Sequence, residues 1–284
     1  MTDDRMSPVI IGDPASVAQA QAYQARRMAY VQRGDVRGLV RDLYTGDARL
    51  HAFDFRAEGG HAIQSVIELL QQRLAGLGPV RVEQFIAGHD FIWQELAIDS
   101  PAGRIEPYEI KFLRDGQVYL QLYGFKQGSL WQPGDLSGFA PPVRSASAAQ
   151  WHLRYIDYQA RQDSDGLADD FFTAEARLMT VKHSVAGRDA LRSFFRHKFQ
   201  TESGFHLVST RNITGADDYA WFEATAGGSL GVRTVYDVML LQGGRVSLQV
   251  VGTLAGALPA NSADLPETTA TASPVVHQPD QFVN

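Results

Sequence analysis

Cysteine is absent from the sequence, which excludes disulfide bridges, thiolate nucleophiles and Cys-ligated zinc or iron–sulfur sites. No stretch reaches the roughly 18 uninterrupted apolar residues of a membrane-spanning helix. The acidic start, MTDDRMSPVIIGD, does not resemble a secretory signal, which would be basic and then apolar. We therefore expect a cytoplasmic protein with no membrane partner.

Basic residues are also few, because 26 Lys and Arg face 32 Asp and Glu and give a formal net charge of −6. Nucleic-acid-binding proteins usually carry a basic excess on one face. The sequence shows no such stripe, so we expect no nucleic-acid partner. Hydrophobic residues make up 44% and charged residues 20%, which indicates a globular protein, and 284 residues suffice for two ordinary domains.

The common metal and nucleotide signatures are missing as well. None of the eight histidines forms an H-x-H or H-x-x-x-H spacing beside a carboxylate cluster. Neither G-x-G-x-x-G after a strand nor G-x-x-x-x-G-K occurs, so we expect no metal and no cofactor. Residues 227–231 read GGSLG and match the G-x-S-x-G nucleophile elbow, but a strand follows where the elbow needs a helix. We interpret this stretch as a hairpin loop.

One offset, 128 residues, aligns the chain with itself. Residues 38–50 read GLVRDLYTGDARL, and residues 166–178 read GLADDFFTAEARL. Roughly a quarter of about a hundred positions are identical without a gap, which indicates a duplicated domain, since solenoid repeats run at roughly 20 to 50 residues. Further identical pairs at this offset are Tyr30 and Tyr158, Asp35 and Asp163, Asp42 and Asp170, Trp93 and Trp221, Glu95 and Glu223, Tyr108 and Tyr236, Gln121 and Gln249, and Gly124 and Gly252.

Within each half, helical patterns precede strand patterns. Helix-like spacing predicts helices over residues 17–32, 36–44 and 62–74, and an extended stretch covers 48–55. Period-two runs then predict strands over residues 80–88, 91–99, 106–114 and 117–125. Helices followed by strands in one unit predict an α+β domain, with three helices against a strongly curved, mainly antiparallel sheet.

This order of elements resembles the nuclear-transport-factor-2-like superfamily, which includes the SnoaL-like polyketide cyclases and ketosteroid isomerase. The resemblance lies in the Gly34-Asp35 break after the first helix, the DAR start of the first strand and the Asp115-Gly116 hairpin before the last strand. It covers residues 18–128 and 146–256 and implies two tandem cone-shaped barrels, each with a small-molecule pocket. Because members pair through their sheets, it also implies an intramolecular pseudo-dimer, with further homodimerisation left open.

Composition sets the expected domain boundaries. We predict a first cone over residues 15–130 and a second over 146–257. Residues 131–145, rich in Pro, Gly and Ser, are expected to form a linker. Residues 258–284 are expected to form a flexible tail.

The resemblance places a general base on the segment that leaves the second helix, which here reads His51-Ala52-Phe53-Asp54. The register admits either His51 or Asp54, and an exposed pair at a strand end is the alternative. Asp54 with Glu83 resembles the acid–base carboxylates of the family's polyether epoxide hydrolases, which are also tandem. In the second half Lys182 stands where the first has Asp54, so its neighbour His183 is a candidate for substrate contact.

The resemblance also implies an oxyanion-donating tyrosine in the first helix of a unit, eight residues before the Asp of the helix break. Tyr155 has this spacing from Asp163, whereas the first half has Arg27 there. A phenol in a dry pocket can stabilise an enolate or alkoxide. A tyrosine that simply packs in the core with one partner is the alternative.

A Trp-x-Glu motif occurs in one predicted strand of each half, as Trp93 and Glu95 and as Trp221 and Glu223. Because side chains two residues apart share a face of a strand, each motif places an aromatic ring and a carboxylate on one face. If that face lines the cone, the aromatic rings contact a flat ligand and the first-half carboxylate is a candidate acid; if not, the pairs are architectural. Tyr108-Glu109 and Tyr236-Asp237 pose the same question. The candidates are Glu95 for catalysis and Trp93, Tyr108, Trp221, Glu223 and Tyr236 for substrate binding.

Together these features predict a cofactor-independent enzyme of specialised metabolism, either a cyclase or isomerase or an epoxide-opening hydrolase. Its partner would be a small hydrophobic molecule of polyketide or terpenoid type, processed by acid–base residues in an apolar pocket. A non-catalytic carrier or sequestering protein of the same fold is one alternative. An interaction module whose pockets are filled by side chains is another.

Overall fold

The computed structural model describes residues 9–255, which divide into two compact units, one ending at Pro142 and the other beginning at Val143. The tail predicted over residues 258–284 lies outside the described residues. Within residues 9–255, no helix combines the length and the apolar character needed to cross a membrane.

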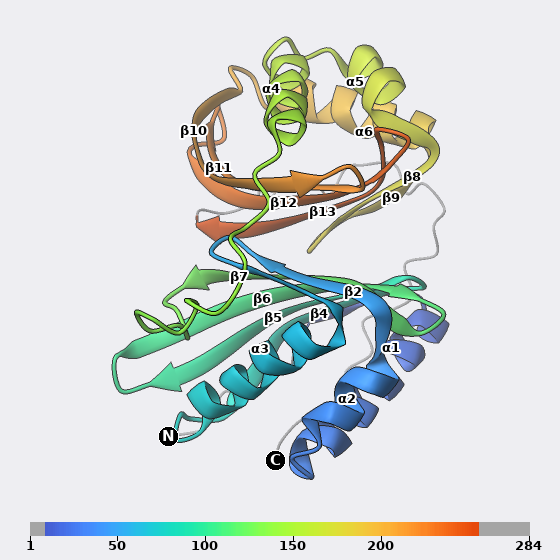
Figure 1. Cartoon of the computed structure of the whole chain (residues 1–284). Coiled ribbons are helices and arrows are strands. Elements are labelled where there is room, and N and C mark those ends of the chain that lie inside the picture. Colours follow the sequence, from blue (N-terminus) through green and yellow to red (C-terminus); the bar gives the residue numbers. More distant parts are fainter. Residues whose placement is uncertain (1–8, 256–284) are drawn as a thin grey trace, which may run out of the picture. The chain divides into compact units, whose positions relative to one another are not determined.

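In the described part of unit 1, three helices cover one face of a curved seven-stranded sheet (Figure 1). The strand order is β1-β4-β5-β6-β7-β2-β3, with β1 parallel to β4, β2 parallel to β7 and the other neighbours antiparallel. The elements are β1 (Val9–Ile11), α1 (Pro14–Gln32), α2 (Val36–Leu43), β2 (Tyr44–Ala52), β3 (Arg56–Glu58), α3 (Gly59–Leu74), β4 (Val80–Gly88), β5 (Phe91–Ser100), β6 (Gly103–Arg114) and β7 (Gln117–Gln127).

The described part of unit 2 repeats this arrangement with six strands in the order β10-β11-β12-β13-β8-β9. β13 is parallel to β8, and the other neighbours are antiparallel. The elements are α4 (Ala146–Ala160), α5 (Ser164–Phe171), β8 (Phe172–Thr180), β9 (Ser184–Ala186), α6 (Arg188–Thr201), β10 (His206–Ala216), β11 (Tyr219–Gly227), β12 (Arg233–Gln242) and β13 (Arg245–Ala255).

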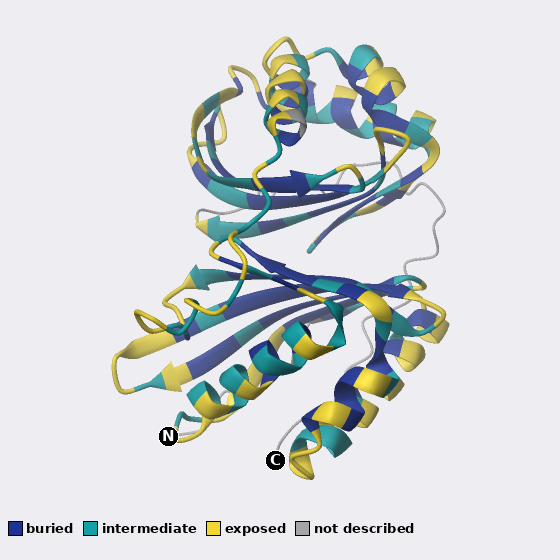
Figure 2. Cartoon of the chain, viewed as in Figure 1, coloured by how far each residue is buried: buried dark blue, intermediate teal, exposed yellow. Residues whose placement is uncertain are grey.

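The predicted fold class is confirmed, because each described unit packs three helices on a curved, mainly antiparallel sheet. The predicted strand over residues 80–88 coincides with β4, and the predicted helix over 62–74 begins three residues earlier, at Gly59. β1 was not predicted, since three apolar residues carry too little pattern to distinguish a strand from a loop. Figure 2 shows the buried residues concentrated on the strands and on the inner faces of the helices.

Several of the repeated residues tie the first two helices of each unit together. Asp163 caps α5 by accepting a hydrogen bond from the Gly166 backbone nitrogen at 2.8 Å, and Asp35 does the same for Gly38 of α2. A Cβ on Gly38 or Gly166 would lie 2.2 or 2.6 Å from the capping carboxylate, so glycine is required at both. The Tyr158 hydroxyl donates to Asp170 just as Tyr30 donates to Asp42.

The repeated tyrosine and glycine of the last two strands in each unit form a cross-strand pair. Tyr236 lies directly opposite Gly252, and Tyr108 lies opposite Gly124. Each ring lies across its glycine, because a Cβ on Gly252 would come within 1.9 Å of the Tyr236 ring. These two identical pairs are therefore explained by packing.

The segment predicted as a linker packs against unit 1 over much of its length. Trp131 stands edge-on to Phe55, with ring centroids 5.4 Å apart, and Phe139 lies 5.3 Å from the same ring. Asp135 pairs with Arg73 of α3. The apolar residues of this stretch thus extend the core of unit 1.

Gly252→Ala is expected to destabilise unit 2 by roughly 1–3 kcal/mol, because the added methyl group overlaps the fully buried Tyr236 ring and forces the strands apart. Urea unfolding followed by circular dichroism measures the change. Gly46→Ala is the matched control, since a Cβ there meets no atom within 4 Å. Equal midpoints for the two variants would show that the ring and the glycine are not tightly packed.

Candidate functional site

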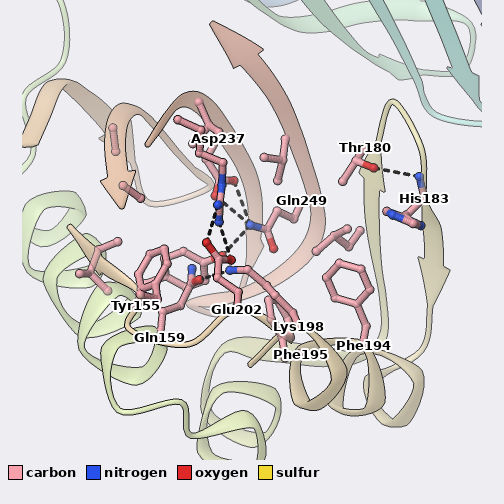
Figure 3. A pocket seen from close by; sticks show the side chains of 18 of the residues that line it. Tyr155, Gln159, Thr180, His183, Phe194, Phe195, Lys198, Glu202, Asp237 and Gln249 are labelled. Carbon is pink, nitrogen blue, oxygen red and sulfur yellow. Dashed lines mark hydrogen bonds and ion pairs between the residues drawn. The ribbon is translucent and has the colours of Figure 1, made fainter. Parts of the chain in front are cut away.

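Unit 2 contains a cavity of about 400 Å³ between the inner face of its sheet and the helices α4 and α6 (Figure 3). Ligand pockets typically measure roughly 300 to 1,000 Å³, so this volume suits a small organic molecule. Most of the lining is apolar and aromatic. It includes Leu178, Phe194, Phe195, Phe205, Leu207 and Phe222.

A connected polar group stands on the wall of this cavity. The side-chain amide nitrogen of Gln249, on β13, donates to both carboxylate oxygens of Asp237, on β12, at 3.0 and 2.9 Å. The same nitrogen donates to the Tyr155 hydroxyl of α4 at 2.8 Å. Asp237, Gln249 and Tyr155 are 4%, 1% and 2% exposed, so water contributes little to their solvation. The register pairs Gln249 with Met239, which makes Gln249 and Asp237 diagonal neighbours on one face.

Burial raises the pKa of Asp237 to about 7, although the Gln249 hydrogen bond and the Lys198 charge act in the opposite direction. Burial also raises the pKa of Tyr155 well above its ordinary value, with Asp237 adding to the effect. A carboxyl group that titrates near neutrality both takes up and releases protons readily. Tyr155 remains protonated and, since its oxygen accepts from Gln249, keeps its own proton for donation.

A second polar group lies beside the first on the same wall. The Lys198 ammonium of α6 donates to the Gln159 side-chain oxygen of α4 at 2.5 Å. Burial lowers the pKa of Lys198 to about 8, with Glu202 opposing the shift. Glu202 is itself engaged by the Arg233 guanidinium in a buried, two-point ion pair. Such a pair is geometrically fixed and satisfies both charges.

Two histidines and a lysine also line the cavity. His183, on the turn between β8 and β9, packs edge-on to Phe194, with ring centroids 5.8 Å apart. Burial and the neighbouring Lys182 lower the pKa of His183, so it is neutral over most of the physiological range. The turn is held by the Thr180 hydroxyl, which accepts from the backbone nitrogen of His183 at 2.8 Å. His197, which precedes Lys198 on α6, is the second histidine of the lining.

Unit 1 has the same inner-face carboxylate in a different electrostatic setting. Glu109 accepts a hydrogen bond from Gln121 at 2.9 Å, the counterpart of Asp237 with Gln249. Burial alone would raise the pKa of Glu109, but the charges of Lys111 and Arg27 hold it below its ordinary value. At the positions of these two cations unit 2 has Met239 and Tyr155. The unit 1 carboxylate is therefore a neutralised structural charge.

The positions of the second polar group are apolar in unit 1. Leu70, Leu74 and Ile105 stand 128 residues before Lys198, Glu202 and Arg233. They pack in one hydrophobic cluster, which also contains Leu130 and Trp131 of the segment after β7. Side chains therefore occupy the part of unit 1 that corresponds to the polar wall in unit 2.

The predicted acid–base residues of the first half do not come together. His51 is buried on β2, with its Nε2 3.7 Å from a carboxylate oxygen of Glu58. Asp54 is exposed on the turn between β2 and β3. Glu83 is exposed on β4 and pairs with Arg104 of β6. Their proposed roles stay predictions, and none of the three lines the unit 2 cavity.

The repeated aromatic and acidic pairs lie on the face of each sheet opposite the helices. Gln94 hydrogen-bonds to Gln24 of α1, so its neighbours Trp93 and Glu95 point to the other face, and Tyr108 lies directly opposite Glu95. In unit 2 the same alternation separates three residues, Trp221, Glu223 and Tyr236, from the cavity-lining Phe222, Ala224 and Asp237. Glu95 binds Lys126 at 2.8 Å, and Glu223 binds Arg211 at 2.8 Å.

Two of the predicted site residues, Tyr155 and His183, line the cavity. Sequence reasoning did not select Asp237, Gln249 or Lys198. The signal for the first two was present, because Gln121 and Gln249 are identical across the repeat and a carboxylate follows each repeated tyrosine. Lys198 carried no signal, since a single lysine within a helix is usually solvent-exposed.

The chain was compared with known proteins, and the solved structures described below each align with 38% of it. No family model matches the chain, and no curated protein matches it. A candidate polyketide cyclase from Sinorhizobium meliloti aligns at 16% identity over 38% of this chain and 99% of its own, with a TM-score of 0.33. A candidate SnoaL-like isomerase from Agrobacterium tumefaciens aligns at 16% identity over 38% and 98%, with a TM-score of 0.35.

An LEH-like epoxide hydrolase from M. tuberculosis also aligns, at 17% identity over 38% of this chain and 84% of its own, with a TM-score of 0.34. The α+β architecture of each unit rests on its own elements and strand registers.

Asp237→Asn is expected to stabilise the protein at pH 8 and to change its stability less at pH 5. The unfolded carboxyl, with an ordinary pKa of 3.8, ionises before the folded one, whose pKa is about 7. The wild type therefore loses stability as the pH rises from about 4 to 7, on the order of 1 kcal/mol per pH unit. Asparagine does not ionise and avoids this loss.

Urea unfolding at pH 5 and pH 8 measures the difference between this variant and the wild type. Asp217→Asn, at an exposed position, serves as the control and should give the same small change at both values. If Asp237→Asn shifted stability equally at pH 5 and pH 8, the carboxyl would not be ionising in that interval.

Proposed function

We propose that this chain is a cofactor-independent acid–base enzyme whose active site is the unit 2 cavity. The observation that carries the proposal is the Asp237 carboxyl, which is buried in an apolar cavity and held by a neutral amide. Its pKa of about 7 lets the same group remove and return a proton at physiological pH. The reaction class is isomerisation or cyclisation through an enolate, or the opening of an epoxide.

For an enolisable ketone, the Asp237 carboxylate takes the proton from the carbon next to the carbonyl. The C–H electron pair becomes the C=C bond of an enolate, and the negative charge moves to the carbonyl oxygen. Donation of the proton from Asp237 to another carbon completes an isomerisation. Tyr155, which keeps its hydroxyl proton, can donate to the enolate oxygen and so stabilise the anion.

For an epoxide, the protonated form of Asp237 is the reactant. It donates its proton to the epoxide oxygen while a C–O bond breaks, and water or a hydroxyl of the substrate attacks the carbon. The proton that the attacking oxygen loses returns, through solvent, to the Asp237 carboxylate and restores its protonated form. The aromatic wall formed by Phe194, Phe195 and Phe222 is suited to a ring-containing substrate of polyketide or terpenoid type. Tight apolar packing around the reacting atoms strengthens the electrostatic effect of each polar group.

A non-catalytic binding protein is the alternative, and one observation favours it. Trp151 stacks on Tyr155 with ring centroids 5.6 Å apart and planes 11° apart, so the tyrosine is held as part of an aromatic wall. A carrier would need only this wall and the polar anchor. Recovery of a bound ligand without chemical change would support this reading.

The test uses two probes, 2-tetralone for proton exchange in D₂O, followed by NMR, and indene oxide for ring opening, followed by chromatography. The wild type is expected to accelerate at least one of these reactions over buffer. Asp237→Asn should lower that rate by about 100-fold or more, as expected for loss of a general acid–base group. Tryptophan fluorescence reports binding independently of chemistry, because Trp151, one of the four tryptophans, stacks against a cavity residue.

Two matched controls, Asp54→Asn and Glu83→Gln, come from the first unit. Both side chains are exposed and lie in unit 1, so turnover should stay within twofold of the wild type. Loss of turnover in Asp54→Asn with activity retained in Asp237→Asn would move the active site to unit 1. Binding of both probes with no reaction of either would favour the carrier.

A further inference from the structure

The cavity of unit 2 contains a cation, Lys198, that forms no ion pair with any carboxylate of residues 9–255. The Lys198 ammonium donates to the neutral Gln159 amide, and it lies 4.8 Å from the centre of the Phe205 ring. Among residues 9–255 no carboxylate lies within ion-pairing distance of it. Its pKa of about 8 keeps it largely protonated at pH 7. A charge in such surroundings gains strongly from an anion brought beside it.

The neighbouring charges are engaged elsewhere. Both carboxylate oxygens of Glu202 accept from Arg233, so this ion pair carries no net charge. Asp237 accepts from the Gln249 amide and is half protonated near neutral pH. The buried polar wall therefore carries a positive charge of between zero and one, depending on whether Asp237 is ionised.

The fold itself does not require a cation at this position. Leu70, the equivalent residue of unit 1, occupies the same place in α3 and packs in an apolar cluster. A helix of this fold therefore accepts an apolar side chain there. The lysine of unit 2 costs desolvation energy that a structural role would not explain.

We propose that Lys198 binds an oxyanion of the ligand, so that the substrate is an apolar ring compound carrying an enolate, phenolate or carboxylate oxygen. The ring lies against the aromatic wall, and the oxygen lies beside the Lys198 ammonium. This deepens the proposed function by naming the substrate class, and it rests on that function only in taking the unit 2 cavity as the ligand site. Lys198 would set specificity by binding charge, and in an enolate mechanism it would stabilise the anion formed when Asp237 takes the proton.

The experiment compares two probes of one shape at pH 7 by isothermal titration calorimetry: 2-naphthoate, which is anionic, and 2-naphthamide, which is neutral. The wild type is expected to bind 2-naphthoate at least about tenfold more tightly. Lys198→Met keeps the length of the side chain and removes its charge. It should abolish this preference and leave the affinity for 2-naphthamide within twofold, which also shows that the variant is folded.

Lys182→Met is the matched control, because Lys182 is an exposed lysine that also borders the cavity. It should keep the preference for 2-naphthoate. Loss of the preference in Lys182→Met but not in Lys198→Met would overturn the assignment. Equal binding of the two probes by the wild type, or no binding of either, would overturn it as well.

The two proposals fail in different ways. If the wild type prefers 2-naphthoate through Lys198 but turns over neither 2-tetralone nor indene oxide, the oxyanion site stands and the enzyme proposal fails for these reactions. If Asp237 supports turnover and Lys198→Met changes neither the preference nor the rate, the enzyme proposal stands and the oxyanion site is wrong.

Discussion

A carboxylate on the inner face of a curved sheet, held by a glutamine of the next strand, is the interaction on which the buried polar groups of both units depend. Such a group is expensive to bury unless a cation or a proton neutralises it. Unit 1 uses cations, because Lys111 pairs with Glu109 on the same strand and Arg27 adds a second positive charge. Unit 2 has neither cation at those positions, so Asp237 keeps its proton until the pH approaches 7.

Comparing the two halves therefore distinguishes residues that the fold requires from residues that make the two inner faces different. Identical residues of the two halves explain caps, helix ties and a tyrosine packed on glycine, which are needs of any unit with this fold. Residues that differ explain why a polar wall borders the inner-face cavity of unit 2. The replacement of Leu70 and Ile105 by Lys198 and Arg233 converts an apolar cluster into a polar wall. Most of the repeated residues thus serve the fold, although the repeated Gln121 and Gln249 also hold the inner-face carboxylates, and the residues around those carboxylates differ between the units.

This division also explains how far sequence reasoning could go. Element order and fold class follow from periodicity and turn residues, which act locally, so strands such as β4 were placed to the residue. The same pattern did not show which side chains of each strand point toward the helices. Trp93 and Ile92 are both apolar and both buried, so alternation could not identify the inner face. Because the inner face was unknown, the pattern did not distinguish Glu95 from Glu109. Of their counterparts in unit 2, Asp237 lines the cavity described above and Glu223 does not.

The two units differ in where they place a buried cation relative to the inner-face carboxylate. In unit 1 the positive charges of Lys111 and Arg27 act on the inner-face carboxylate and hold its pKa below its ordinary value. In unit 2 a positive charge is present but stands on α6, bound to an amide, and leaves the carboxyl able to titrate. An ammonium and a titrating carboxyl that share one apolar cavity without pairing can act on two different atoms of the same molecule. In unit 1 the inner-face carboxylate is ion-paired, whereas in unit 2 the ammonium of Lys198 and the carboxyl of Asp237 are not paired with each other, which is the arrangement that the proposed mechanism requires.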